Sequence, residues 1–301
     1  MLPIIPLLRL MRPANIVTAV SDILAGFAIA VYATGTEWNE LPLRSIILLI
    51  ISTIGLYGGG VVLNDVFDAE LDRTERPERP IPAGMISKRA AGVAGLALLL
   101  AGILAAAFAQ SDPFSSPSFY IAVAIAVAAV FYDGWGKHLN LFGPVNMGLC
   151  RGLNLLLGMS ILPAALMEFW FIGFVPIVYI AAITMISRGE VHGGRKHILV
   201  SAAALYSTVI GAILFVGFRN DTLPYAAPFA ALFAAMIFLP LRKAIQTPKG
   251  PLIGKAVKAG VIALILMNGA WAAAFGSFYF GLIIILLLPV SILLGKAFMV
   301  T

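Results

Sequence analysis

Four residues with oxygen-bearing side chains end one apolar stretch: Asn64, Asp65, Asp68 and Asp72. At about 100° per residue, an α-helix would bring all four within an arc of roughly 100°. Carboxylates that close repel one another, and a divalent cation would relieve the repulsion. Hard oxygen ligands suit Mg²⁺, which commonly takes one or two carboxylates together with phosphate oxygens of a substrate.

The loop that follows is rich in arginine and proline. Arg73, Arg76 and Arg79 are interspersed with three prolines before Gly84. Guanidinium groups can bind phosphate through two parallel hydrogen bonds. The stretch therefore predicts a metal-assisted phosphate site. The alternative is a solvated loop in which acids and arginines pair only with each other.

The composition indicates what must position these groups. Of the 301 residues, 61% are hydrophobic and 11% charged, and the mean hydropathy is +1.00, so the chain is unlike a soluble domain. Apolar runs long enough to cross about 30 Å of hydrocarbon recur along it. We expect an all-α polytopic membrane protein. A single cysteine excludes an intramolecular disulfide. The net charge of +6 fits membrane orientation better than binding of nucleic acid.

The apolar stretches predict nine or ten spans. The residues after 259 could form two spans, or one broken span and a surface helix. The ten expected spans are 14–33, 44–63, 90–109, 118–136, 142–162, 168–187, 197–217, 224–241, 256–274 and 277–296.

The loops between these spans alternate in Lys and Arg content. One alternate set of loops is rich in these residues and the other set is poor in them. Of the 20 Lys and Arg residues, only Arg44 and Arg219 fall in the poor set. By the positive-inside rule, the rich loops and the N-terminus are cytoplasmic. We expect a multi-pass protein of the bacterial inner (plasma) membrane. The first residues lack the order of a signal peptide and should lead into the first span. The rich loops are 64–89, 137–141, 188–196 and 242–255.

Three stretches resemble one known family. "NDVFDAELDR" with "ERPIPAG" resembles the first aspartate-rich motif of the UbiA superfamily of intramembrane prenyltransferases, N-D-x-x-D-x-x-x-D followed by R-P-I-x-x-G. "RPANIVTA" resembles the start of that family's first helix. "FYDGWGKHLNLFGPVNMGLCRG" resembles its junction between the fourth and fifth helices.

The resemblance implies a fold and a reaction. It implies one UbiA-type domain over residues 1–301, with helices around a central cavity and cap loops at about 64–89 and 188–196. Two Asp motifs of the family hold Mg²⁺ and an isoprenoid diphosphate. Ionisation of the diphosphate gives an allylic carbocation, which an apolar acceptor captures. The expected partners are a prenyl diphosphate, this acceptor, the lipid bilayer and membrane proteins of the same pathway, with no nucleic acid.

The resemblance also implies residue roles. Asn64, Asp65, Asp68 and Asp72 would bind the metal, and Asp68 and Asp72 would serve catalysis through it. The residues expected to contact substrate are Arg12, Asn15, Arg73, Arg79, Tyr132 and Lys137.

The second motif departs from the family pattern, which usually has D-x-x-x-D. Here Arg188 and His192 occupy the two outer positions, and Glu190 lies between them. These cations, with Arg195 and Lys196, could hold diphosphate in place of a second metal. Glu190 and His192 could instead do acid–base catalysis on an acceptor. In a third interpretation, the catalytic site has decayed or been repurposed.

This variant is similar to the UbiA-like branch called EboC. The shared features include "SRGEVHGGRKH" and the later stretch "GPLIGKAVKAGVIALILMNGAWAAAFG". That branch suggests the alternative function, a non-catalytic membrane protein that binds or helps to export a secondary-metabolite precursor or lipid.

Two further ionisable residues, Asp22 and Arg151, lie inside spans, where such groups are often functional. They could pair with each other or line the cavity.

Overall fold

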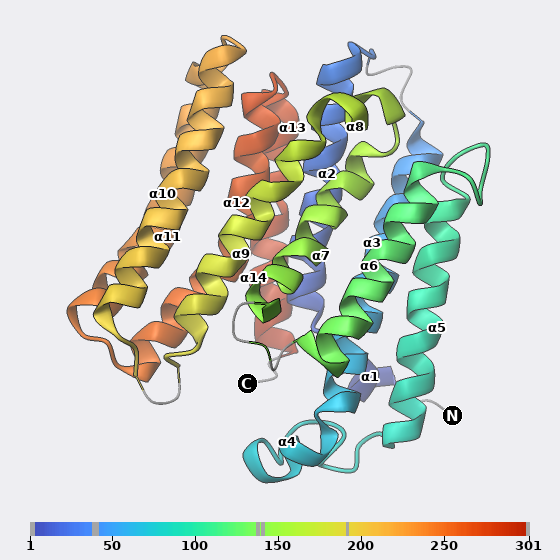
Figure 1. Cartoon of the computed structure of the whole chain (residues 1–301), viewed down its shortest axis with the longest axis vertical. Coiled ribbons are helices and arrows are strands. Elements are labelled where there is room, and N and C mark those ends of the chain that lie inside the picture. The colour runs from blue at the N-terminus through green and yellow to red at the C-terminus, as the bar shows by residue number, and fades with distance from the viewer. Residues whose placement is uncertain (1–3, 38–41, 137–138, 140–141, 191–192, 299–301) are drawn as a thin grey trace.

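The computed structural model describes residues 4–37, 42–136, 139, 142–190 and 193–298, and no strand occurs among them. Long helices run side by side along one axis (Figure 1). In chain order they are α1 (Ile4–Met11), α2 (Pro13–Thr34), α3 (Leu43–Phe67), α4 (Ala69–Glu75), α5 (Lys88–Ala107), α6 (Pro117–Gly134), α7 (Phe142–Met159), α8 (Pro163–Phe169), η3 (Trp170–Gly173), α9 (Phe174–Ser187), α10 (Lys196–Arg219), α11 (Leu223–Gln246), α12 (Gly250–Ala274), α13 (Phe278–Ile285) and α14 (Leu287–Ala297).

The expected count of nine or ten spans is confirmed for the described residues. Nine helical segments there are long and apolar enough to cross a membrane, with α8 to α9 and α13 to α14 each forming one segment. Helix α7 occupies a tenth expected span, but Asn146, Arg151 and Asn154 make it more polar. The all-α polytopic expectation is therefore correct.

The C-terminal region settles one alternative. Helix α12 has the length of a full span, and α13 and α14 together form another, interrupted at Leu286. Pro289 has no backbone N–H to donate to the carbonyl of Ile285, so the helical hydrogen bonding is interrupted there. The idea of one broken span and a surface helix after residue 259 is wrong.

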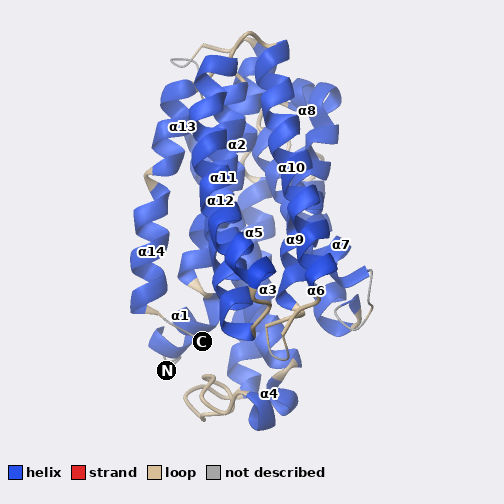
Figure 2. Cartoon of the chain, turned by 90° about the vertical axis from the view of Figure 1, so that its left-hand side faces the viewer, coloured by secondary structure: helices blue, strands red, loops and turns tan. Residues whose placement is uncertain are grey.

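The segments rich in Lys and Arg lie together. Helix α4, the α9–α10 and α11–α12 connections and both termini lie at the same end of the bundle (Figures 1 and 2). We call this the basic end. Alternate loops run to the opposite end, as the alternation of charge along the sequence predicts.

Close packing of α2 against α7 sets up the interior. A side chain at Gly26 would clash with the backbone at Leu155, and one at Gly158 would clash with the backbone at Ile23. Small residues of this kind let membrane helices approach closely. The approach brings the inner face of α2 against the polar face of α7, where Asp22 meets Arg151.

Candidate functional site

A central cavity of about 300 Å³ lies among α2, α3, α6, α7, α9 and α12. Its middle is apolar, with Leu56, Ile125 and Ile180 on three different helices. Polar groups lie at both ends. At 1.5 Å per residue, the eleven steps along the helix from Thr53 to Asn64 separate these ends by about 16 Å. The polar lining at the basic end is Arg12, Asn15, Asn64, Tyr132 and Asp133, and the deeper polar lining is Thr53, Tyr57, Arg151 and Asn154.

The acidic motif lies where α3 passes into α4. Helix α3 ends at Phe67 and α4 begins at Ala69, so Asp68 lies between them. The Asp68 N–H donates to the Asn64 carbonyl at 2.9 Å, and the Asp72 N–H donates to the Asp68 carbonyl at 2.8 Å. Helical hydrogen bonding therefore continues through the junction. The expected spacing is kept, with Asp65 and Asp72 buried and Asn64 and Asp68 half-buried.

Two arginines already contact this motif. Arg12 Nη2 lies 2.7 Å from Asp65 Oδ1, which also accepts from Arg79 Nη1 at 3.3 Å. The same Arg79 nitrogen lies 2.7 Å from Asp72 Oδ2. The other oxygen of Asp65, Oδ2, is buried and accepts no hydrogen bond from the described residues. One buried carboxylate oxygen thus has unused capacity to accept a hydrogen bond or bind a cation.

Arg12 has an unusual backbone. Its φ of 52° and ψ of 69° place it in the left-handed region, between the end of α1 and the first turn of α2. For a non-glycine residue this conformation costs on the order of 1–3 kcal/mol, and such strain concentrates at functional sites. The ion pair with Asp65 helps to hold it.

Asp133 belongs to the site although the sequence reasoning did not include it. Its Oδ1 accepts a hydrogen bond from Asn64 Nδ2 at 2.9 Å, which joins α6 to α3. The available signal was a carboxylate at the end of an apolar span, beside the expected Tyr132. The Tyr132 hydroxyl lies within electrostatic range of Asp68, Asp133 and Arg188. Arg188 from the second motif and Asp68 from the first motif thus act on the same hydroxyl.

The other expected site residues divide into three groups. Arg73 pairs with Glu70 at 2.9 Å, and both side chains are largely exposed. Arg195 and Lys196 are exposed at the start of α10. Lys137 and His192 lie outside the described residues.

Glu190 links the two loops at the basic end. Its side chain remains exposed. Partial burial nonetheless raises the pKa of the Glu190 carboxyl above its usual value, and the charge of Arg76 opposes that rise. The charge of Arg76 acts on this carboxyl, so the loop after α9 and the loop after α4 lie within electrostatic range of each other.

The deep end of the cavity holds a second polar network. Arg151 Nη1 donates to Asp22 Oδ2 at 2.8 Å, which confirms the pairing considered from sequence. Asn154 donates to the same oxygen at 3.0 Å, and Asn268 donates to Asp22 Oδ1 at 2.8 Å. The Arg151 guanidinium also lies 5.0 Å from the ring centroid of Tyr57. Asp22 therefore ties α2 to α7 and α12.

The donor set at the basic end fits a magnesium ion that arrives with a substrate. Within the described ranges, no three His, Cys, Asp or Glu side chains are grouped closely enough to hold a metal ion by themselves. Magnesium is usually bound by one or two carboxylates, with waters and substrate phosphates completing its shell. Asp68 and the buried, unpartnered Oδ2 of Asp65 are oxygen ligands of that kind.

The fold and site define a multi-pass helical membrane protein with a polar-ended central cavity. A profile of the UbiA prenyltransferase family matches residues 23–252. The chain belongs to this family. It is 31% identical to a digeranylgeranylglyceryl phosphate synthase of Sulfolobus acidocaldarius, over 75% of this chain and 80% of that protein. It is 33% identical to a synthase of the same name from Methanothrix thermoacetophila. That match spans only about half of each protein, 50% of this chain and 53% of the relative.

A solved structure shares the fold. The UbiA homologue of Archaeoglobus fulgidus bound to DMAPP and Mg²⁺ superposes with a TM-score of 0.62 and 17% identity. The match covers 86% of this chain and 98% of that one. The UbiA-type arrangement of helices expected from the sequence is therefore confirmed.

Proposed function

We propose that this chain is an intramembrane prenyltransferase that moves an isoprenyl group from a prenyl diphosphate to an apolar acceptor. The observation that carries the proposal is the position of the acidic motif. Arg12, Asn64 and Asp133 line one end of an apolar cavity, and Asp68 follows Asn64 by one helical turn. Arg12 and Arg79 pair with the adjoining Asp65 and Asp72. A diphosphate would bind at this end while its hydrocarbon tail enters the cavity.

The chain's own residues have distinct roles in this proposal. Asn64, Asp65, Asp68 and Asp72 hold Mg²⁺, which supplies Lewis-acid stabilisation of the leaving diphosphate when bound. Arg79 and Arg12 turn from carboxylates to phosphate oxygens, where their positive charge stabilises the charge that develops on the leaving group. The apolar walls, including Ile125 and Ile180, exclude water from the allylic cation.

The second loop contributes positive charge in place of the family's second acidic motif. Arg188 lies within electrostatic range of Tyr132, which lines the cavity, and in this proposal Arg188 contacts the bound diphosphate. Arg195 and Lys196 follow at the start of α10 and add to the field. We propose His192 and Lys137 as further contacts on the strength of the sequence. In this arrangement the protein lies in a bacterial inner membrane, and its basic end faces the cytoplasm, following the positive-inside rule.

A non-catalytic function of the EboC type is the second candidate. The feature that favours it is the pairing of Asp65 and Asp72 with arginines, together with Arg188 at a position where the family usually has aspartate. A chain arranged in this way could bind a lipid or metabolite precursor without cleaving a diphosphate. The two functions differ in whether pyrophosphate is released.

Pyrophosphate release therefore tests the proposal. The purified chain would be incubated with prenyl diphosphates of several lengths and a membrane extract as the source of acceptors, with Mg²⁺ or with EDTA. We expect metal-dependent release that falls by about 10²–10³-fold in Asp68→Asn, because a group that stabilises developing charge is lost. Asp72→Asn should behave similarly.

Asp112→Asn is the matched control, because Asp112 is an exposed carboxylate in the α5–α6 loop at the opposite end. It should release pyrophosphate at the wild-type rate. Binding of donors without any cleavage would favour the EboC-type function. Equal loss in all three variants would contradict the placement of the site.

A further inference from the structure

Asp133 contacts the acidic motif from a different helix. It lies in the last turn of α6, outside both motifs recognised in the sequence, and it is 4% exposed. Its Oδ1 accepts a hydrogen bond from Asn64 Nδ2 at 2.9 Å. Both residues line the basic end of the central cavity. The contact therefore joins α6 to a residue that is expected to bind the metal.

The packing of α3 against α6 sets up this contact. Gly60 lies one turn before Asn64 on α3, and Ala129 lies one turn before Asp133 on α6. A methyl carbon added at Gly60 would lie only 3.3 Å from the Ala129 Cβ. The two small residues let the helices approach closely, and four residues further along each helix the amide meets the carboxylate.

The chemistry of the pair fixes which way the Asn64 amide faces. An ionised carboxylate accepts hydrogen bonds and cannot donate them, so Asp133 selects the Nδ2 group of the amide. The planar amide then directs Oδ1 away from Asp133. Among the described residues, no group donates a hydrogen bond to this Oδ1. The amide oxygen, which is the atom that suits Mg²⁺, thus has unused capacity to bind a cation.

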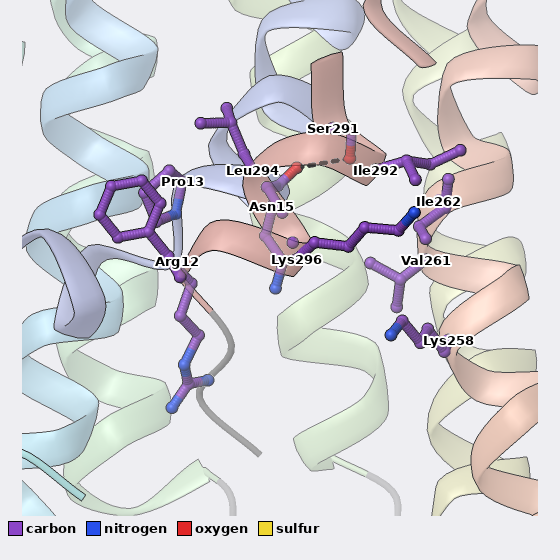
Figure 3. A pocket seen from close by; sticks show the side chains of 13 residues that line it. Arg12, Pro13, Asn15, Lys258, Val261, Ile262, Ser291, Ile292, Leu294 and Lys296 are labelled. Atoms are coloured by element: carbon purple, nitrogen blue, oxygen red, sulfur yellow. Dashed lines mark hydrogen bonds between the residues drawn. The ribbon is translucent and has the colours of Figure 1, made fainter. Parts of the chain in front are cut away.

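The cations on the α2 side of the cavity do not orient this amide. A pocket of about 480 Å³ between α2, α12 and α14 adjoins the central cavity, and Lys258 and Lys296 line it (Figure 3). Arg12 lines both spaces, and its side chain extends away from the two lysines (Figure 3). Its Nη2 donates to Asp65 Oδ1 at 2.7 Å rather than to Asn64. The orientation of the amide therefore depends on α6.

We propose that Asp133 is a positioning residue that holds the amide oxygen of Asn64 toward the metal. The inference rests on the proposed function, in which Asn64 binds Mg²⁺, and deepens it by naming the group that orients this ligand. Without Asp133 the amide is free to turn and present its N–H groups, which repel a cation. Loss of a group that orients a metal ligand typically weakens metal binding by about 10–100-fold.

A double-mutant cycle in magnesium affinity tests this role without turnover. The purified full-length chain in detergent micelles would be titrated calorimetrically with Mg²⁺, at a fixed concentration of a non-cleavable thio-analogue of geranyl diphosphate. We expect Asp133→Ala to weaken Mg²⁺ binding by about 10–100-fold. In the Asn64→Ala background the same change should have little further effect, because the amide on which Asp133 acts is gone.

Full additivity in this cycle would overturn the inference. A double variant that loses the product of the two single losses would show that Asp133 acts on the metal without Asn64. Unchanged Mg²⁺ affinity in Asp133→Ala would overturn it as well.

Asp133→Asn separates the hydrogen bond from the charge. Its side chain keeps the shape of aspartate, and its oxygen can still accept from Asn64 Nδ2 although the charge is lost. We therefore expect this variant to recover most of the Mg²⁺ affinity that Asp133→Ala loses. A loss as large as that in Asp133→Ala would assign the effect to charge alone and overturn the positioning role.

Asn146→Ala is the matched control for the packing of α6. Asn146 is a buried amide on α7 whose Nδ2 donates to the Ala128 carbonyl of α6 at 3.0 Å, and it does not line the central cavity. The variant should lose stability in thermal unfolding but keep the Mg²⁺ affinity of the wild type. A loss of affinity as large as that in Asp133→Ala would show that disturbing α6 is sufficient, and it would overturn the inference.

The outcome is separable from that of the proposed function. If the wild-type chain binds Mg²⁺ and the diphosphate analogue but releases no pyrophosphate, the prenyltransferase proposal fails, while the coupling between Asn64 and Asp133 is still measured. Pyrophosphate release by the wild type together with additive losses in the cycle would overturn only the role of Asp133.

Discussion

The two polar ends of the central cavity hold their charges in different ways. At the deep end, Asp22 is fully buried, and both of its oxygens accept hydrogen bonds from neighbouring helices. At the basic end, Asp65 is also buried, but one of its oxygens has no partner in the described residues. Its partner Arg12 retains 29% side-chain exposure.

This difference in hydrogen bonding indicates a structural role for the deep end and a ligand-binding role for the basic end. A buried ion pair surrounded by further hydrogen bonds has no simple alternative partner, so the Asp22 network fixes the positions of α2, α7 and α12. The carboxylates of Asp65 and Asp72 at the basic end are shared by two arginines, and one of these, Arg12, is partly exposed and lines the cavity. An incoming anion can therefore compete for Arg12. We therefore expect mutations to affect stability at the deep end and ligand binding at the basic end.

The largest expected effect follows from breaking the deep pair. Asp22→Asn leaves the Arg151 guanidinium buried without its carboxylate, which should destabilise the chain by about 3–5 kcal/mol. Unfolding by SDS in mixed micelles would measure the change. The double variant Asp22→Leu/Arg151→Met removes both charges and should be less destabilised than the single variant. Equal destabilisation in the two variants would show that the ion pair is not the reason.

An intermediate effect is expected from Arg79. Arg79→Gln removes the cation shared by Asp65 and Asp72, so these carboxylates should bind free Mg²⁺ more tightly while a prenyl diphosphate binds more weakly. The metal-free chain should lose about 1–3 kcal/mol of stability. Calorimetric titration with Mg²⁺ and with a non-cleavable diphosphate would measure both affinities.

Arg73 provides the matched control for that experiment. Its only ion pair in the described structure is with the exposed Glu70, and such surface pairs contribute about 0–1 kcal/mol. Arg73→Gln should therefore leave the stability and the metal affinity nearly unchanged. A change as large as that of Arg79→Gln would indicate that Arg73 faces the ligand.

The smallest expected effect concerns Glu190. Because the folded pKa of this carboxyl is raised, the folded chain binds more protons than the unfolded chain between the usual value of about 4.3 and the raised value. Its ionisation therefore lowers stability as pH rises through that interval. The stability of Glu190→Gln relative to the wild type should therefore be higher at pH 8 than at pH 4. Thermal unfolding at both values would measure the difference.

Arg76 tests the cause of that shift. Its charge favours the ionised carboxyl, so Arg76→Gln should raise the pKa of Glu190 further and enlarge the difference between the two pH values. The variant Arg76→Gln/Glu190→Gln should show no such difference. A pH dependence that persists in this double variant would have to come from another group.

The spans and the acidic motif could be predicted because both depend on local order. Hydropathy locates α2 to α12, and a helical spacing of four places Asp68 and Asp72 together whatever surrounds them. The pairing of Asp22 with Arg151 could not be derived, because it depends on how closely α2 approaches α7 at Gly26 and Gly158. Lys258 and Lys296 look like ordinary interface lysines until the packing of α12 against α14 places them at one pocket.

The charges at the basic end also have a consequence for assembly in the membrane. Asp65, Asp72, Arg12 and Arg79 comprise two negative and two positive groups, so their sum is zero. Buried charges that compensate one another need no counterion from solution. The helices can therefore insert and pack in a bilayer that offers neither metal nor isoprenoid.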